Sequence, residues 1–294
     1  MADVRVFANA AELNLRAAEA VAAIISSAVR ARGRCSLALS GGETPRALYD
    51  VLATTFREQI PWPQVHVFWG DERVVPVGSA LRNDQMAREM LLSKVACPEA
   101  HIHPMATGPV SADEAARDYE ETMRQYFSDN RPRFDLVLLG LGAEGHTASL
   151  FPNSPALDEQ VRWVRAVEVP ADPPSRLTLT LPVLSQAANA YFLVAGAGKA
   201  RALRAALNET TDPKTCPAAA IRLADGALTW WVDTTAANTH RDQDKSKGAT
   251  EGADQKPVPQ DPIGANVDDS EVSRSGETGK TSDAPRDEER PLHK

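Results

Sequence analysis

The sequence predicts an α/β protein of the Rossmann-like, three-layer α/β/α type, with helices on both faces of a largely parallel sheet. Three observations support this fold class. Apolar runs of strand length alternate with segments of helical periodicity along most of the chain. Several of these runs end in glycine-rich or polar turns, as strands of parallel sheets do. With 43% hydrophobic residues, the chain can also fill a core of that size.

The first half of the chain contributes four strands and four helices to this expectation. The predicted strands are 4–7, 35–40, 65–70 and 134–140, and the predicted helices are 9–32, 45–52, 84–93 and 111–127. Gly33 ends the first helix. Thr44 is expected to cap the second helix, with Pro45 in its first turn.

The second half repeats the alternation. The predicted strands are 163–169, 176–184, 189–196 and 227–233, with a helix over 198–207. We expect Trp230 and Trp231 to alternate across the last strand, one of them packing on the core. His101 and His103 are expected on a short edge strand near the surface. These residues have no predicted role in catalysis.

The composition changes at Thr239. Residues 239–294 contain no aromatic side chain and only scattered aliphatic ones. Such a segment cannot bury enough apolar surface to offset chain entropy, so it is expected to be a disordered polar tail. Residues 1–238 then form a single α/β catalytic domain. The mixed charges of the tail and the net charge of −8 do not suggest a nucleic-acid partner.

The cysteines and the hydropathy indicate where the protein acts. Cys35, Cys97 and Cys216 are odd in number, widely separated and without a C-x-x-C pair, which argues against a disulfide framework and favours a reducing cytoplasm. No run of 18 uncharged apolar residues occurs, and the first residues lack a basic leader. We therefore expect a soluble, cytoplasmic protein without a membrane partner.

Residues 134–152, FDLVLLGLGAEGHTASLFP, are the most informative stretch. An apolar strand leads into three glycines and then to His146 and Thr147, which we expect at the first turn of a helix. Backbone N–H groups and the helix dipole favour a bound phosphate at such a position. The stretch therefore predicts a titratable imidazole beside an anion site.

The same glycines, Gly140, Gly142 and Gly145, also match the G-x-G-x-x-G pattern of dinucleotide sites. That pattern requires a long helix after its third glycine. Pro152 follows seven residues later and would cost about 3 kcal/mol inside a helix, so any helix here is short or begins later. The pattern also belongs in the first strand–helix unit, which it does not occupy here. We disfavour the dinucleotide hypothesis.

Four strand ends carry turns that a parallel sheet would gather at one edge. They are SGGETPR (40–46), GDER (70–73), GLGAEGHTAS (140–149) and GAGKAR (196–201). Arg46, Arg73 and Lys199 suit a phosphate or a developing oxyanion, and the glycines add backbone N–H groups. A small phosphorylated anion is the predicted ligand. A nucleoside triphosphate is disfavoured because G-x-x-x-x-G-K-[ST] does not occur.

Six segments in order resemble one known family, the glucosamine-6-phosphate isomerases and 6-phosphogluconolactonases. They are LALSGGETPRALY (37–49), VFWGDERVVP (67–76), NDQMARE (83–89), LVLLGLGAEGHTASLFP (136–152), PPSRLTLTLPVL (173–184) and FLVAGAGKARAL (192–203). The resemblance spans roughly residues 3–236. The continuation HTASLFP is similar to the lactonase branch of the family.

The chain departs from the family pattern at two places. Glu144 stands where the family usually has Asp, which keeps the carboxylate but lengthens its reach by one methylene. Arg82-Asn83 replaces a usual Ser-Asn pair. Whether Glu144 still orients the imidazole, and what Arg82 does, are open at this point.

The resemblance implies hydrolysis of 6-phospho-D-glucono-1,5-lactone to 6-phosphogluconate, the second step of the oxidative pentose phosphate pathway, without a cofactor or a metal. A δ-lactone is an activated ester, so a general base and fixed positioning suffice. His146 is the expected base, Arg73 is expected to steady the carbonyl oxygen or to orient the substrate, and Glu144 completes the expected catalytic set. The expected substrate-binding residues are Gly41, Gly42, Thr44, Arg46, Asp71, Asn83, Thr147, Arg176 and Lys199, with Thr44, Arg46, Arg176 and Lys199 at the 6-phosphate.

Two alternatives from other functional classes stay open. An aminosugar-phosphate isomerase and deaminase would need a second base, which Asp71 could supply. A sugar-phosphate sensor that regulates transcription would need a helix-turn-helix or a basic patch, and the acidic chain suggests neither. Ser149 is not in G-x-S-x-G, so it is not an α/β-hydrolase nucleophile. We expect a monomer.

Overall fold

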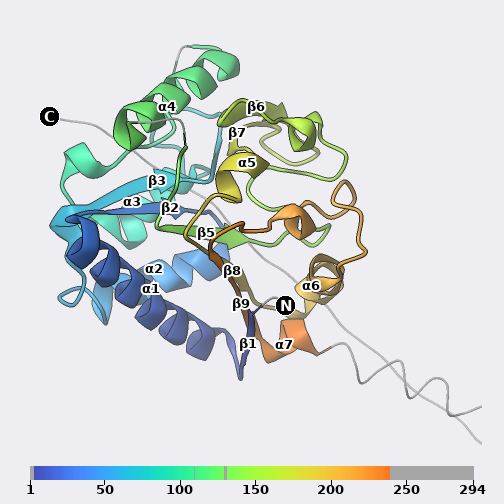
Figure 1. The fold of residues 1–294 in the computed structure, drawn as a ribbon, viewed down its shortest axis with the longest axis horizontal. Helices are drawn as coiled ribbons and strands as arrows, with labels where there is room; N and C mark the ends of the chain where they lie inside the picture. The colour runs from blue at the N-terminus through green and yellow to red at the C-terminus, as the bar shows by residue number, and fades with distance from the viewer. Residues whose placement is uncertain (1–2, 109, 129–130, 239–294) are drawn as a thin grey trace, which may run out of the picture. The chain divides into compact units, whose positions relative to one another are not determined.

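The strands in the described part of the chain form two sheets, one large and one small (Figure 1). The computed structural model describes residues 3–108, 110–128 and 131–238, and these residues fall in one compact unit. The predicted tail, 239–294, lies outside the described residues. The predicted boundary between residues 238 and 239 therefore stays a prediction.

The large sheet has six strands, all parallel, in the order β1-β9-β8-β5-β2-β3. Its strands are β1 (Asp3–Phe7), β2 (Cys35–Leu39), β3 (Val65–Trp69), β5 (Leu136–Gly140), β8 (Asn189–Val194) and β9 (Ala227–Asp233). The central strands β2, β5 and β8 are almost wholly buried, which explains why they are continuous apolar runs. The α/β fold with a largely parallel sheet is confirmed.

Three short strands form a separate antiparallel sheet in the order β4-β7-β6, which the sequence did not predict. They are β4 (Asp71–Arg73), β6 (Val164–Glu168) and β7 (Ser175–Leu179). The residues of β4 were expected in a turn, and 176–184 as one long strand. The strand ends at Leu179, and α5 (Leu181–Leu184) begins two residues later. Pro182 lies in the first turn of α5 and has no N–H to continue a strand ladder.

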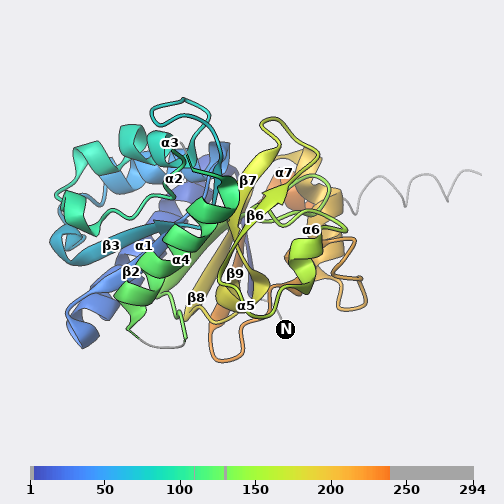
Figure 2. The same ribbon diagram turned by 90° about the horizontal axis from the view of Figure 1, so that it is seen from above.

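Helices cover both faces of the large sheet. Besides α5, the helices are α1 (Ala10–Arg32), α2 (Glu43–Thr54), α3 (Asn83–Met90), α4 (Ala112–Phe127), α6 (Ala200–Leu207) and α7 (Thr234–Ala237). Short 3₁₀ turns occupy Trp62–Gln64, Leu92–Lys94, Glu99–His101, Pro155–Asp158, Ala197–Lys199 and Pro217–Ala220. In Figure 1, α1 and α2 lie on one side of the sheet, and α4, α5 and the small sheet lie on the other. Figure 2 shows α4 beside β6 and β7, which it contacts.

Helix ends differ in part from expectation. The side chain of Asn9 caps α1 by accepting from the Glu12 N–H, and Gly33 ends this helix with φ 73°, as predicted. The prediction that Thr44 caps α2 is wrong. The N-cap is Gly42, whose φ of 104° suits glycine, and Thr44 lies inside the first turn.

The histidine and tryptophan predictions also need correction. His146 and Thr147 do not begin a helix, because residues 141–154 form a loop and a 3₁₀ turn follows. His101 ends a 3₁₀ turn instead of lying on an edge strand, and Ile102 makes only a single bridge to Val67. Trp230 and Trp231 are both buried, stacking on Phe192 and Phe7 respectively.

The strand order creates a crevice between β2 and β5. From β2 the chain goes outward to β3, and from β5 it goes outward in the opposite direction to β8 and β9. Ligands of open α/β sheets bind outside the carboxyl ends of the strands at such a reversal. The loops that follow β2 and β5 are the two glycine-rich loops singled out in the sequence.

Candidate active site

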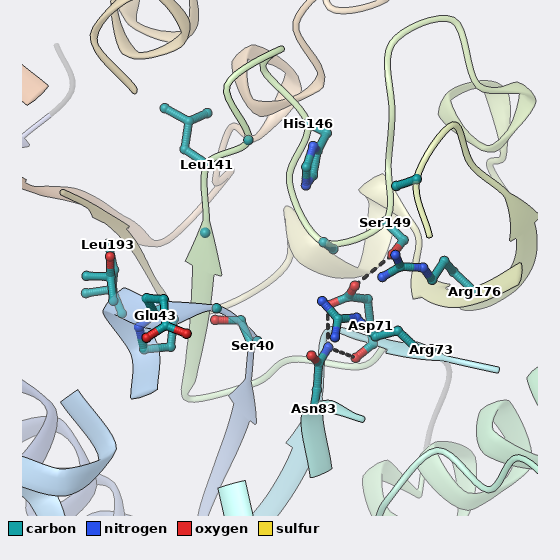
Figure 3. A pocket seen from close by; sticks show the side chains of 18 of the residues that line it. Ser40, Glu43, Asp71, Arg73, Asn83, Leu141, His146, Ser149, Arg176 and Leu193 are labelled. Carbon is teal, nitrogen blue, oxygen red and sulfur yellow. Dashed lines mark hydrogen bonds between the residues drawn. The ribbon is translucent and has the colours of Figure 1, made fainter. Parts of the chain in front are cut away.

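A cavity of about 470 Å³ opens at the carboxyl ends of the strands (Figure 3). All four predicted loops contribute to its lining, which confirms that they gather at one edge. The predicted site residues that line it are Gly41, Gly42, Thr44, Asp71, Arg73, Asn83, His146, Arg176 and Lys199. Further lining residues include Ser40, Glu43, Ser149, Phe151, Ala171 and Leu193.

His146 is presented by a tight loop after β5. The Gly142 N–H donates to the carbonyl oxygen of His146 at 2.8 Å, and the Gly145 N–H donates to that of Gly142 at 3.0 Å. Gly145 has a φ of 94°, a conformation that favours glycine. The imidazole consequently projects into the cavity (Figure 3).

Glu144 lies on the same loop and contacts the imidazole. Its Oε1 is 2.9 Å from Nδ1 of His146, so the longer side chain at this position still reaches the ring. Burial raises the pKa of Glu144, but hydrogen bonds from its own N–H and from His146, with the charges of His146 and Lys199, outweigh burial and hold that pKa below its usual value. Glu144 is therefore a carboxylate at neutral pH, and its hydrogen-bond partner is Nδ1 of His146.

Asp71 is held by two side chains from distant parts of the sequence. The Ser149 hydroxyl donates to Asp71 Oδ2 at 2.7 Å, and the Asn83 amide donates to Oδ1 at 3.3 Å. Both carboxylate oxygens are thus occupied, and Asp71 and Ser149 are buried. The Asn83 side chain lies against Gly41, where a Cβ would overlap it.

Glu72, which carried no sequence prediction, is fully buried beneath these residues. Its carboxylate accepts the N–H groups of Arg73 (2.8 Å), Asn83 (2.7 Å) and Asp84 (2.9 Å). Glu72 thereby ties β4 to the start of α3 and fixes the backbones of Arg73 and Asn83 relative to each other. Burial raises the pKa of Glu72 to about 7, although these hydrogen bonds oppose the shift.

Arg82 lies behind the same junction and does not line the cavity. It is buried, and its guanidinium donates to Asp84 Oδ1 at 2.6 Å, to the Met105 carbonyl at 2.8 Å and to the Thr107 hydroxyl. Arg82 therefore supplies a buried ion pair with Asp84 that anchors α3.

Two guanidinium groups line one side of the cavity. Arg73 Nη1 donates to the Leu81 carbonyl at 2.5 Å, and Arg176 Nε donates to the Pro173 carbonyl at 2.6 Å. Burial, followed by repulsion from Arg73, lowers the pKa of Arg176. Two arginines close enough to repel each other at a cavity wall form a favourable site for an anion.

The start of α2 offers a second anion site in the cavity. Gly42 caps the helix without a side-chain hydrogen bond, which leaves N–H groups of the first turn directed outward. Among the described residues, the buried Ser40 hydroxyl has no hydrogen-bond partner, and it lines the cavity (Figure 3). Lys199, from the loop after β8, lines the same cavity.

Arg46 and Thr147 do not line the cavity. Arg46 is exposed in the first turn of α2, because only the residues before it face the sheet edge. Thr147 is fully buried, and its hydroxyl donates to the Gly140 carbonyl at 2.9 Å. Its contribution is to the shape of the His146 loop.

Sequence reasoning missed Ser40, Glu72 and Ser149. Ser40 directly precedes Gly41, and Ser149 follows His146 by three residues. Both lie in loops that the sequence predicts at the site, so their position could have indicated a role. Glu72 gave none, because a charged residue beside two others usually faces solvent.

No cluster of three or more histidine, cysteine, aspartate or glutamate side chains with metal-binding geometry occurs in the residues that the structure describes. Within the same residues, no helix has the length and apolar character needed to cross a bilayer.

Comparisons with known proteins place this geometry in a family. The family model of the glucosamine-6-phosphate isomerases/6-phosphogluconolactonase matches residues 8–230. A 6-phosphogluconolactonase of Synechocystis is 42% identical over 78% of this chain and 95% of its own length. A 6-phosphogluconolactonase of Mycobacterium tuberculosis is 40% identical over 80% of this chain and 96% of its own length. The solved structure of 6-phosphogluconolactonase from Trypanosoma cruzi aligns with a TM-score of 0.71 at 30% identity, covering 81% of this chain and 98% of that one. The chain belongs to the glucosamine-6-phosphate isomerase/6-phosphogluconolactonase family.

Proposed function

We propose that this chain hydrolyses 6-phospho-D-glucono-1,5-lactone to 6-phosphogluconate, with His146 as the general base. The reaction is supported by the relatives named 6-phosphogluconolactonase, which are 40–42% identical over most of the chain. The role of His146 rests on one observation, an imidazole paired with a carboxylate and projecting into a cavity that Arg73, Arg176 and Lys199 also line.

The proposed steps use only groups of this chain and water. With Nδ1 of His146 facing Glu144, Nε2 is the nitrogen that faces the cavity. Nε2 takes a proton from water while the water oxygen bonds to the lactone carbonyl carbon, giving a tetrahedral oxyanion. The ring C–O bond then breaks, the carbonyl re-forms as the acid, and the imidazolium returns its proton to the leaving alkoxide.

The charged groups around the imidazole support these steps. Glu144 stabilises the imidazolium, and Arg73 stabilises the oxyanion. A positioned base contributes about 10²–10⁴-fold to the rate, and one oxyanion donor about 10²–10³-fold. Such factors suffice for an activated ester, so a covalent nucleophile is not required.

For the 6-phosphate we propose the start of α2, with Thr44, the Ser40 hydroxyl and Lys199. This site combines free N–H groups, an unpartnered hydroxyl and a cation. The sequence predicts Arg176 at the phosphate, but its neighbour in the structure is Arg73, and we propose that Arg176 binds the lactone end. Arg46 has no part in the proposed site. A monomeric state and a cytoplasmic location complete the proposal.

The test measures disappearance of the lactone, generated in situ, with wild type and His146→Ala against the spontaneous rate. We expect His146→Ala to lower kcat at least about a hundredfold while the variant folds and binds 6-phosphogluconate. An unchanged kcat would refute His146 as the base. No acceleration by wild type would refute the reaction and favour aminosugar phosphates as substrates, for which Asp71 would be the second base.

A further inference from the structure

Phe151 lies flat against the imidazole of His146. The ring centroids are 4.1 Å apart and the ring planes differ by 14°. Phe151 is only 5% exposed, although it lines the cavity. Both residues lie in the loop 141–154, five positions apart.

Gly142 limits the imidazole near Nδ1. A Cβ on Gly142 would overlap the Nδ1, Cε1 and Cγ atoms of His146. The backbone of Gly142 therefore lies against the ring near Nδ1, at a distance that only glycine allows. The imidazole cannot move toward Gly142.

Together with Glu144, these contacts leave the imidazole one orientation. Glu144 holds Nδ1 at 2.9 Å, Phe151 covers one face, and the backbone of Gly142 lies against the ring near Nδ1. A partial rotation about the Cβ–Cγ bond would break the hydrogen bond and tilt the ring away from Phe151, and a half-turn would keep the stacking but lose the hydrogen bond. The nitrogen that stays available to the cavity is Nε2.

An aromatic face also interacts with charge. A cation beside the face of an aromatic ring is stabilised by the ring quadrupole, and the effect grows where water is excluded. His146 becomes a cation when it takes a proton, and the stacked Phe151 ring then lies against that cation. A leucine would fill similar space without this interaction.

We propose that Phe151 is a positioning residue for the proposed reaction: its ring holds the His146 imidazole with Nε2 toward the cavity and stabilises the imidazolium formed during proton transfer. The inference rests on the proposed function, because it takes His146 as the base. Phe151 acts through His146 and takes no part in bond making.

The charged groups that share the cavity with the imidazole must be considered in any pH experiment. The cavity is lined by Glu43, Asp71, Arg73, Arg176 and Lys199, and Glu144 contacts the imidazole from its own loop. Replacement of Phe151 changes none of these charges. A shift in the titration of His146 would therefore report the loss of the aromatic face.

The experiment compares Phe151→Leu and Phe151→Tyr with Phe192→Leu as a matched control. Phe192 is also buried and stacked, 3.9 Å from the ring centroid of Trp230, but it does not line the cavity. We would measure kcat and KM between about pH 5.5 and 7.5, where a histidine titrates. The imidazole of His146 would be titrated by NMR without substrate, with His146→Ala identifying its signal.

We expect Phe151→Leu to lower kcat about tenfold, to leave KM within about twofold, and to lower the pKa of His146. Phe151→Tyr, which keeps the aromatic face, should restore most of kcat and the titration. Phe192→Leu should lower Tm like Phe151→Leu but leave kcat and the His146 titration as in wild type.

The proposal fails if folded Phe151→Leu keeps the wild-type kcat, if its kcat falls without a change in the His146 titration, or if Phe192→Leu lowers kcat equally. A different result would show that the proposed function itself fails, namely retained activity in His146→Ala. Even then, the NMR titration of Phe151→Leu would show whether the stacked ring supports the imidazolium.

Discussion

The chain holds imidazoles in two very different settings, and their comparison shows how neighbours decide what a histidine does. At the active site, His146 has one carboxylate partner, Glu144, and an aromatic face. At the edge of the large sheet, His66 on β3 lies among other imidazoles. It stacks on His101 at 3.9 Å, and its Nδ1 is 3.2 Å from Nε2 of His103.

The second setting, which we call the His66 cluster (His66, His101 and His103), disfavours charge. Burial, followed by repulsion from His101, His103 and Arg34, lowers the pKa of His66 to about 4. Burial and His101 likewise lower the pKa of His103. Tyr126 packs on the cluster as well and carries no charge at neutral pH, since burial raises its pKa to about 12. The comparison shows that burial first, and neighbouring imidazoles second, disfavour a charged ring at His66, whereas His146 has a carboxylate within hydrogen-bond distance of Nδ1.

The largest effect is expected from a substitution that removes the carboxylate beside the active-site imidazole. Glu144→Gln keeps the shape of the side chain but cannot balance an imidazolium, so we expect kcat to fall about 10- to 100-fold with little change in KM. Steady-state kinetics would measure both constants. Glu144→Asp, one methylene shorter, is the control and should retain more activity than Gln. A wild-type kcat in Glu144→Gln would show that the dyad is dispensable.

The converse experiment adds a carboxylate to the His66 cluster. In His101→Glu, the side chain that stacks on His66 becomes an anion, and we expect the pKa of His66 to rise by about one unit or more. NMR titration of the imidazole would measure the shift. His101→Gln, which removes the neighbouring imidazole without adding charge, should give a smaller rise. Equal shifts in both variants would mean that the carboxylate has no specific effect.

Acid should destabilise the protein through the His66 cluster. Because the pKa of His66 is about 4 in the folded chain and about 6.5 when unfolded, the unfolded state binds more protons between these values. The contribution of His66 to stability is therefore constant above about pH 6.5 and is lost as the pH decreases toward 4. His66 is half-buried, so solvent screening limits its share to about 1 kcal/mol, or a Tm decrease of about 2–4 °C.

Thermal denaturation of wild type and His66→Phe at several pH values would test this. The variant keeps an aromatic ring in the stack but cannot be protonated, so its Tm should depend less on pH over this window. An identical pH dependence in both proteins would contradict the assignment to His66.

The smallest effect concerns the backbone. The active-site loop contains two non-glycine residues with positive φ, Ala148 (49°) and Asn153 (60°), whereas no residue of the His66 cluster has one. A left-handed alanine costs about 1–2 kcal/mol, partly offset in Ala148→Gly by the greater freedom of glycine in the unfolded chain. We expect Ala148→Gly to raise Tm by about 1–3 °C, measured by calorimetry. A lower Tm would show that the methyl group contributes packing that exceeds the strain.

The sequence by itself determined the alternation of strands and helices, the parallel sheet and the four loops at its carboxyl edge. These features are local. Apolar periodicity defines each element, glycine and polar residues end it, and parallel strands must place their following loops on one side. The sequence also put His146 and Glu144 on one loop, two residues apart, but left open whether the carboxylate reaches the imidazole, which the structure shows at 2.9 Å.

Only the tertiary structure decided the contacts between distant segments. Ser149 and Asp71 are 78 residues apart, yet one hydrogen bond joins them. Glu72 is buried only because α3 presents its N–H groups to it, and β4 exists only because β7 pairs with it. Local patterns do not encode such contacts, because burial and hydrogen-bond partners depend on which segments pack together, and that depends on the energy of the whole fold.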